Sequence, residues 1–424
     1  MTYFPLTKTQ REWQERVADL AQREVAPRAE ETDRTGQYPQ ESLEALQRAG
    51  LWGLRVSQEH GGLSADLLTT CLIVEELSKH CPSTAMCYKM HLEAAEIVCR
   101  IPTPYQVEHF VKPMAQGQVF TTIAGSESWG EGDNWSASQN ASHVTPVDGG
   151  YQVDGVRKSY VTSAGHATHY QFRCRIGAET PQSQASLLFI ERDNIDWQVL
   201  EPWHGVGMRG NHSSPMRFSG FVPAENRLGP EHTVQNVTNS FNRPVIALTY
   251  AAAYLGIGSG AYALACTEIS RRFPSGARRL DSAINQRRMA EMSAQLEAAR
   301  ALLHATAATF DQQLTTSQLP YMQAKVVCAE AAVRVTQDVM TIFGGTAFAS
   351  RLPFSATSGT PALGWSWAWR MTPPTRIWCH CCSPTEPEAL LSTARLVPHG
   401  TRRPHAARSP RTSSVLPWGL SRGS

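Results

Sequence analysis

The chain has 424 residues, of which 42% are hydrophobic and 18% charged, and its formal net charge is +2. This length predicts two or three domains, and the balanced charge gives no reason to expect nucleic acid as a partner. The first residues contain no apolar leader, and no later stretch is expected to reach the roughly 18 apolar residues of a membrane span. We therefore expect a cytoplasmic protein without a membrane span.

The first part of the chain, residues 1–115, has the pattern of amphipathic helices. Apolar residues over 13–25 recur at helical spacing, and Pro27 predicts the end of this first helix. A second helix is expected to begin at Pro39, and a third to cover 67–77. These patterns predict an amino-terminal α-helical domain.

The amino-acid composition changes over residues 116–235, which are rich in threonine, valine and aromatic residues. The Asp-Gly-Gly at 148–150 and the Asp-Gly at 154–155 are turn formers that can adopt a positive φ angle. Short apolar runs such as 186–190 and 216–218 predict strands between such turns. A compact antiparallel barrel or sandwich fits this spacing, and we expect a middle β-barrel domain.

Three long helical segments follow, at about 243–272, 281–313 and 320–343. The second carries a continuous apolar stripe over 289–303, which is typical of a bundle helix. These segments predict a carboxy-terminal helical bundle over residues 236–354. The order of helices, strands and helices predicts an α+β fold, in which ligands favour the junctions between domains.

Short motifs spread over residues 1–354 resemble the acyl-CoA dehydrogenase family. They lie at 6–11, 24–29, 50–54 and 59–63 in the first helical part, at 126–133, 160–165 and 207–210 in the strand-rich part, and at 343–348 in the last helical part. Each motif alone is weak, but all occur in family order and in the expected secondary structure. The resemblance implies the family's fold, with an amino-terminal helical domain, a middle antiparallel β-barrel and a carboxy-terminal helical bundle.

The resemblance also implies FAD as the cofactor and an acyl-CoA, or a related acyl thioester, as the substrate. In this family a carboxylate removes the α proton and the β hydrogen leaves as a hydride to flavin N5, which gives the enoyl thioester. The family implies a role in fatty acid metabolism, with an electron-transfer flavoprotein or another acceptor as the electron partner. It further implies a homo-oligomer, either a dimer or a tetramer.

Residues at the matching positions are expected to hold the FAD. Thr162 corresponds to a hydroxyl donor near flavin N5, and Ser126 to a polar contact near the ring. Arg272 corresponds to the arginine that meets the FAD pyrophosphate of a neighbouring subunit. The full set implied by the resemblance is Ser126, Thr162, Ser163, Arg272, Phe343, Gly344 and Gly345. No metal is expected, because the cysteine and histidine cluster at 379–382 lacks a second cluster to complete a tetrahedral site.

The chain departs from the family at the catalytic base, which is a glutamate at one of two positions. The early position falls at Ile246, in an apolar run, and the late one lies where the family pattern has ended, so the base is unassigned. Glu127, Glu131 and Asp133 are candidates, although a solvated or capping role is the more common interpretation of loop carboxylates. Two alternatives stay open: a flavin-dependent monooxygenase or oxidase on the same fold, and a catalytically impaired relative that binds flavin and acyl-CoA.

Residues 355–424 do not continue the family pattern. They contain nine prolines, ten serines and eight arginines but only two acidic residues, a composition that predicts disorder rather than a bundle helix. Such a composition is typical of a GC-rich coding region read in a shifted frame. We hypothesise a frameshift near codon 355 that leaves the bundle incomplete. Translating the gene in the other frames tests this, and finding no family pattern there would contradict it.

Overall fold

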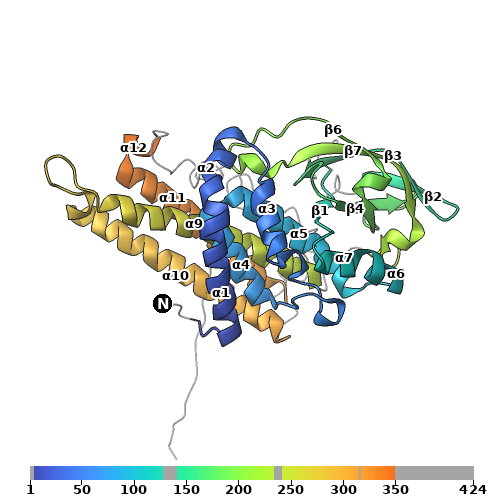
Figure 1. The fold of residues 1–424 in the computed structure, drawn as a ribbon, viewed down its shortest axis with the longest axis horizontal. Helices are drawn as coiled ribbons and strands as arrows, with labels where there is room; N and C mark the ends of the chain where they lie inside the picture. The colour runs from blue at the N-terminus through green and yellow to red at the C-terminus, as the bar shows by residue number, and fades with distance from the viewer. Residues whose placement is uncertain (1–3, 128–140, 234–240, 315–316, 349–424) are drawn as a thin grey trace, which may run out of the picture. The chain divides into compact units, whose positions relative to one another are not determined.

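Helices form both ends of the described chain, and strands form its middle (Figure 1). The computed structural model describes residues 4–127, 141–233, 241–314 and 317–348, and the tail at 355–424 lies outside these ranges. The amino-terminal helices are α1 (Lys8–Leu20), α2 (Ala26–Thr35), α3 (Gln40–Arg48), α4 (Leu67–His80), α5 (Pro82–Arg100), α6 (Pro104–Gln106) and α7 (Lys112–Ala115).

The first helix does not end near Pro27, contrary to the sequence prediction. A π-helical turn at Ala21–Val25 follows α1, and α2 begins at Ala26 with Pro27 in its first turn. Proline is tolerated there because the N–H that it lacks would have no partner in the new helix. The wider turn therefore lets the chain continue as helix to Thr35.

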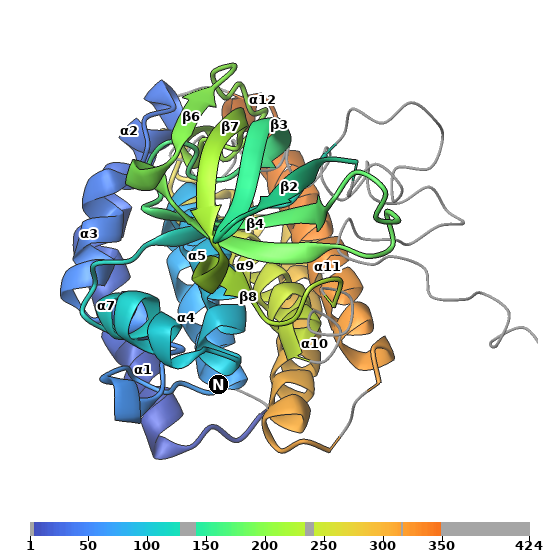
Figure 2. The same cartoon turned by 90° about the vertical axis from the view of Figure 1, so that its right-hand side faces the viewer.

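The strands form one eight-stranded sheet. In Figure 2 this sheet faces the viewer. Its hydrogen-bonded path runs β6-β7-β3-β2-β4-β5-β8, and β1 pairs with β4. Most neighbours are antiparallel, as expected, but β1 and β2 each pair with β4 in parallel, so the sheet is mixed. The strands are β1 (Thr121–Ala124), β2 (His143–Val147), β3 (Gly150–Val161), β4 (His169–Ile176), β5 (Ser186–Glu191), β6 (Asp196–Val199), β7 (Ser214–Pro223) and β8 (Arg227–Leu228).

The two glycine turns predicted in this region have different outcomes. The first connects β2 to β3, with Gly149 at a φ angle of 77°. The second is not a turn, because Gly155 lies inside β3 at a φ angle of 61°. The register between β3 and β7 shifts between Val153 and Val156, so Gly155 forms a bulge within the strand.

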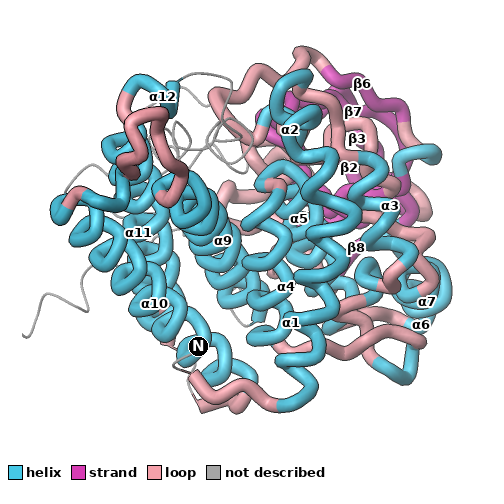
Figure 3. Tube along the Cα trace, turned by 60° about the vertical axis from the view of Figure 1, so that its left-hand side comes forward, coloured by secondary structure: helices cyan, strands magenta, loops and turns pink. Residues whose placement is uncertain are grey.

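The carboxy-terminal helices are α9 (Arg243–Ile269), α10 (Ala283–Asp311), α11 (Leu319–Phe343) and α12 (Gly345–Phe348), as Figure 3 shows beside α4. Their bounds agree closely with the three predicted segments. Two glycines bring α9 and α4 together: a Cβ added to Gly256 would lie 2.3 Å from the backbone oxygen of Glu75, and one added to Gly260 would lie 2.4 Å from that of Lys79.

Helix α9 is apolar over most of its length. Its best 18-residue window has a mean hydropathy of 1.3, and by length and composition the helix could cross a membrane. The expectation that no stretch reaches this limit is therefore corrected. However, 83% of that window is buried inside the protein. The core helix of a soluble protein has these same properties, and α9 packs against α4, α10 and α11.

Candidate active site

Two segments of the β-sheet region meet where β3 ends and β7 begins. The hydroxyl groups of Thr162 and Ser213 lie 2.9 Å apart and are both buried. The backbone N–H of Ser163 donates to the carbonyl of Asn211 at 3.0 Å. Two segments that are about 50 residues apart in the chain therefore form one small polar surface, which contains two of the predicted FAD residues.

The backbone of this polar surface is strained. Ser163, Met208 and His212 have φ angles of 59°, 49° and 46°, in the left-handed region that side chains other than glycine rarely adopt. Such conformations persist only where the surroundings enforce them, and they cluster at functional sites. The strain therefore supports a functional role for the segments at 160–165 and 208–213.

Tyr160 is a neighbour of this site that the sequence prediction did not select. It is near the end of β3, two residues before Thr162, which lies in the turn that follows the strand. Its side chain is 53% exposed, whereas Thr162 is buried. Its place in the motif at 160–165 was the signal that could have identified it.

Ser126 and Glu127 follow β1. The carbonyl of Ser126 accepts a hydrogen bond from the N–H of Ser159 at 2.8 Å, which holds this segment against β3. The carboxylate of Glu127 is buried and forms an ion pair with Lys158 and hydrogen bonds with Ser142. Glu127 therefore forms a structural ion pair. The other two candidate bases, Glu131 and Asp133, lie outside the described residues.

An apolar cluster joins residues of α5 and α9 to residues of β1 and of the segment before β7. Its buried members are Met86 and Met90 of α5, Met208, and Ile257 of α9, and Ile123 of β1, Tyr250 and Tyr254 pack against them. Ile123 is three residues before Ser126, and Met208 is five residues before Ser213. Methionine side chains adapt readily to different shapes, as binding surfaces require. We call this set the methionine cluster.

A buried ion pair adjoins the methionine cluster. Lys89 and Glu93 of α5 are 0% and 1% exposed, and their charged atoms lie 2.5 Å apart. Glu93 also accepts a hydrogen bond from the hydroxyl of Thr249 at 2.7 Å. Burial raises the pKa of Glu93, although the charge of Lys89 opposes this. The sequence prediction missed the pair, whose signal is a Lys and a Glu four residues apart, a spacing at which helical side chains can pair.

The other predicted FAD residues lie together, but away from the sheet. Arg272 follows α9 and donates to the carbonyl of Gly276 at 2.8 Å. The guanidinium of Arg279 in the same connection lies 5.2 Å from the ring centroid of Phe343, and Gly344 and Gly345 follow that residue. In Figure 1 the carboxy-terminal ends of α9 and α11, and α12 after them, lie on the opposite side of the helices from the sheet.

Ile246, at the early position of the family's base, is buried in the first turns of α9. An isoleucine has no proton-accepting group, so the described residues place no carboxylate at this position. The late position lies outside the described residues. The structure therefore leaves the catalytic base unassigned.

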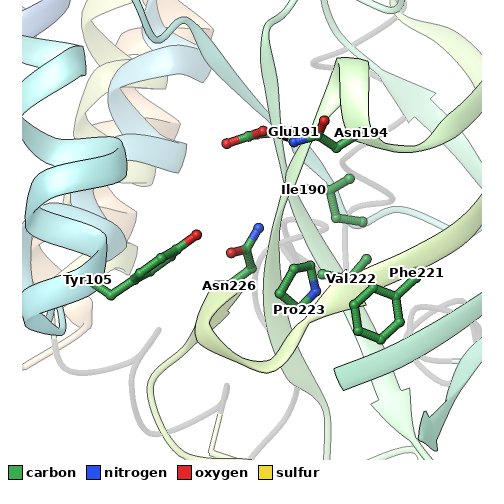
Figure 4. Close-up of a pocket in the computed structure, with 8 residues that line it drawn as sticks. All are labelled: Tyr105, Ile190, Glu191, Asn194, Phe221, Val222, Pro223 and Asn226. Atoms are coloured by element: carbon green, nitrogen blue, oxygen red, sulfur yellow. Dashed lines mark hydrogen bonds between the residues drawn. The ribbon is translucent and has the colours of Figure 1, made fainter. Parts of the chain in front are cut away.

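A separate pocket of about 270 Å³ lies on the sheet region (Figure 4). Its walls come from α6, the end of β5 and the end of β7, and none of the predicted FAD residues contributes to it. Its lining residues are Tyr105, Ile190, Glu191, Asn194, Phe221, Val222, Pro223 and Asn226.

The groups of the polar surface and the methionine cluster fit a flavin. The hydroxyls of Thr162 and Ser213 suit the polar edge of the ring, and an apolar cluster suits its faces. An arginine such as Arg272 suits phosphate oxygens, because its hydrogen bonds to phosphate are charge-assisted.

Family models match most of the described chain. The model of the acyl-CoA dehydrogenase N-terminal domain matches residues 7–118, and the model of the C-terminal domain matches residues 241–378. The second match extends 24 residues past position 354, where the sequence prediction had placed the end of the resemblance. The boundary at 354 was therefore set too early.

Relatives with known names agree with the family models. The chain is 27% identical over 360 residues to the short-chain specific acyl-CoA dehydrogenase of Clostridium acetobutylicum, with 82% of this chain and 91% of the relative covered. The structure of butyryl-CoA dehydrogenase from Megasphaera elsdenii is similar with a TM-score of 0.79 and 23% identity, over 86% of this chain and 95% of that one.

The FAD complex of PigA is also similar, with a TM-score of 0.75 and 19% identity, over 86% of this chain and 95% of that one. At this identity the two structural likenesses show the fold, and the family models show the membership. The predicted arrangement of helical, strand and helical regions is confirmed. The chain belongs to the acyl-CoA dehydrogenase family, whose members are FAD-dependent oxidoreductases that act on CH–CH groups.

Proposed function

We propose that this chain removes hydrogen from the α and β carbons of an acyl-CoA thioester to form the enoyl thioester, with hydride transfer to flavin N5. The observation that carries the proposal is a set of contacts in a chain of this family. Ser126 accepts a hydrogen bond from Ser159 of β3, the Thr162 hydroxyl lies 2.9 Å from that of Ser213, and Ile123 and Met208, which precede Ser126 and Ser213, belong to one apolar cluster. Bound FAD supplies the two-electron acceptor.

The protein's own residues bind and orient. Thr162 and Ser126 would contact the polar parts of the flavin ring, and Ser163 lies in the strained turn that follows Thr162. The methionine cluster contacts the acyl group and excludes water, which strengthens the electrostatic interactions at the thioester. Removal of the α proton also needs a desolvated base, which the described residues do not identify.

The separation of the two groups of FAD residues supports a homo-oligomer. Arg272 and the segment Phe343–Gly345 lie away from Ser126 and Thr162 in one chain (Figure 1). A cofactor as long as FAD would then contact its ring-binding residues in one subunit and Arg272 in a neighbouring subunit. We propose a dimer or tetramer in the cytoplasm that acts in fatty acid metabolism and passes electrons to an electron-transfer flavoprotein or another acceptor.

An anaerobic titration tests the proposal. The purified protein is expected to show a flavin absorption spectrum that bleaches when a saturated acyl-CoA is added, with formation of the enoyl-CoA. A flavin that stays oxidised with every thioester tested would contradict dehydrogenation.

A flavin-dependent oxidase or monooxygenase is the second candidate, because an isoleucine occupies the early base position. Oxygen consumption with substrate or with a supply of reduced flavin distinguishes it from a dehydrogenase. If acyl-CoA binds to the flavoprotein without bleaching or oxygen uptake, the chain is a binding relative that does not turn over.

A further inference from the structure

The loop that follows α2 contacts the strained turn at the end of β3, which contains Ser163. The ring of Tyr38 in this loop stacks on the imidazole of His166, with ring centroids 3.8 Å apart and an interplanar angle of 7°. His166 belongs to the same turn, because its backbone N–H donates to the carbonyl of Ser163 at 3.0 Å. The amino-terminal helical part of the chain therefore contacts the turn that begins at Thr162.

Two side-chain hydrogen bonds join this turn to the segment before β7 and to the end of α2. Nε2 of His212 lies 2.9 Å from the carbonyl oxygen of Gly36, which can only accept, so Nε2 carries the proton and donates. Nδ1 of the neutral His212 ring is then an acceptor, and Nε2 of His166 donates to it at 3.0 Å. The contact with Gly36 thus fixes the direction of both hydrogen bonds.

Both ends of the histidine contact are next to the hydroxyl groups of the polar surface. His212 has a φ angle of 46° and directly precedes Ser213, whereas Ser163 has a φ angle of 59° and directly follows Thr162. The backbone N–H of Ala164 donates to the carbonyl of His212 at 3.1 Å. Left-handed conformations of such residues persist only where the surroundings hold them. A displacement of either strained residue would therefore move the hydroxyl beside it.

The segment before β7 has a second link to α2, through Arg209. Its guanidinium forms an ion pair with Asp33, and its Nε donates to the carbonyl of Asp33 at 2.6 Å. This link holds position 209 on the helix. Of the two links, only the one through His166 and His212 reaches the turn at the end of β3 as well.

We propose that His166 and His212 are positioning residues for the flavin, because their hydrogen bond holds the strained turn in the conformation that directs the Thr162 hydroxyl to the ring. The inference rests on the proposed function, since it takes Thr162 to contact the flavin. The two histidines act through Thr162 and take no part in proton or hydride transfer.

The first test separates the hydrogen bond from the ring stack. His166→Phe keeps a ring against Tyr38 but loses the donor, whereas His166→Gln keeps an N–H that can reach His212 but loses the ring. On reconstitution of the apoprotein, the Kd for FAD is expected to rise by about threefold to tenfold in His166→Phe, as for the loss of one hydrogen bond. It should stay near the wild-type value in His166→Gln. Equal affinity in all three proteins, or an equal loss in both variants, would overturn the proposal.

The second test asks whether His166 acts through Thr162. In a chain that already carries Thr162→Val, His166→Phe is expected to raise the Kd for FAD by less than about twofold, because the hydroxyl that it positions is absent. The absorption bands of the bound flavin respond to hydrogen bonds at the ring, so the two single variants should shift them in the same direction. Additive losses of affinity, or shifts in opposite directions, would contradict the proposal.

A matched control alters a similar histidine and tyrosine pair elsewhere. Tyr105 and His109 stack with ring centroids 3.9 Å apart and an interplanar angle of 17°, and Nδ1 of His109 lies 2.9 Å from the carbonyl oxygen of Tyr105. This pair begins in α6, outside the strained turn and the segment before β7. His109→Phe is expected to leave the affinity for FAD and the flavin spectrum unchanged. An effect equal to that of His166→Phe would overturn the proposal.

Flavin binding separates this inference from the proposed function. If the flavin never bleaches with an acyl-CoA, dehydrogenation fails, but the affinities and spectra of the variants still report the position of Thr162. The His166 side chain is exposed, so both variants are expected to fold, and the melting temperatures of the apoproteins check this. If His166→Phe does not fold, His166→Ala removes the same donor and should also weaken FAD binding. Wild-type affinity in His166→Ala would overturn the proposal.

Discussion

His91 of α5 accepts a hydrogen bond at Nδ1 from the backbone N–H of Thr121 in β1, at 3.1 Å. Because Nδ1 is an acceptor, the proton of the neutral ring is at Nε2, which donates to the carbonyl of Trp52 at 2.8 Å. Protonation of Nδ1 would break the bond to Thr121. This ring therefore holds the first strand on the helices only in its neutral form.

The protein is expected to become less stable as the pH is lowered, because of His91. Burial lowers its pKa from 6.5 to about 4. Between these values the unfolded chain binds more protons than the folded chain, so the free energy of unfolding falls as the pH falls from 6.5 toward 4, by about 3 kcal/mol in total. Urea unfolding at several pH values measures this slope. His91→Gln should flatten it, and an equally steep slope in that variant would contradict the assignment.

Breaking the buried pair of Glu127 and Lys158 is expected to destabilise the protein. Glu127→Gln leaves the ammonium of Lys158 buried without its carboxylate, which costs about 3–5 kcal/mol. Urea unfolding measures the loss, and the double variant Glu127→Leu with Lys158→Met should recover most of it. If Glu127→Gln instead abolished flavin bleaching at unchanged stability, Glu127 would be the catalytic base.

Removing the Thr162 hydroxyl is expected to weaken flavin binding. Thr162→Val keeps the shape of the side chain but removes one hydrogen-bonding group, and a typical hydrogen bond contributes about 0.5–1.5 kcal/mol, or up to about tenfold in Kd. Reconstitution of the apoprotein with FAD, followed by absorbance, measures the affinity. Thr162→Ser keeps the hydroxyl and should bind nearly as well as the wild type. Equal affinity in Thr162→Val would exclude a contact with the ring.

A cofactor site shared between subunits predicts complementation. Arg272→Gln and Thr162→Val are each expected to lower flavin occupancy when expressed alone. In mixed oligomers some sites combine an intact Thr162 with the intact Arg272 of another chain, so co-expression should restore part of the flavin per subunit, measured by absorbance. Failure to exceed the average of the two single variants would place both residues in the same chain's site.

Gly256→Ala is expected to destabilise the packing of α4 on α9. The added Cβ would lie 2.3 Å from a backbone oxygen, which only a shift of one helix can relieve. Overpacking of this kind costs about 1–3 kcal/mol, measured by urea unfolding. Gly345→Ala is the control, because a Cβ there meets no atom within 4 Å. Equal effects in the two variants would exclude steric overlap as the cause.

Local patterns predicted most of the secondary structure. The long helices α9, α10 and α11 begin and end within a few residues of the predicted segments, because a helix's apolar stripe repeats within one stretch of chain. The turn at Gly149 was predicted for the same reason, since it depends on adjacent residues. The errors occurred at Pro27 and Gly155, where the chain continued through a π turn and a bulge that neighbouring elements stabilise.

The sequence by itself determined the family, the order of helices and strands, and the segments expected at the flavin, because these depend on residue types at short spacings. Only the tertiary structure decided which charged side chains are buried and which of them form ion pairs. It paired Glu127 with Lys158 and placed Lys89 and Glu93 against the methionine cluster. The first is a contact across 31 residues, and the second depends on which helix faces are buried, so neither burial nor pairing can be derived from local spacing.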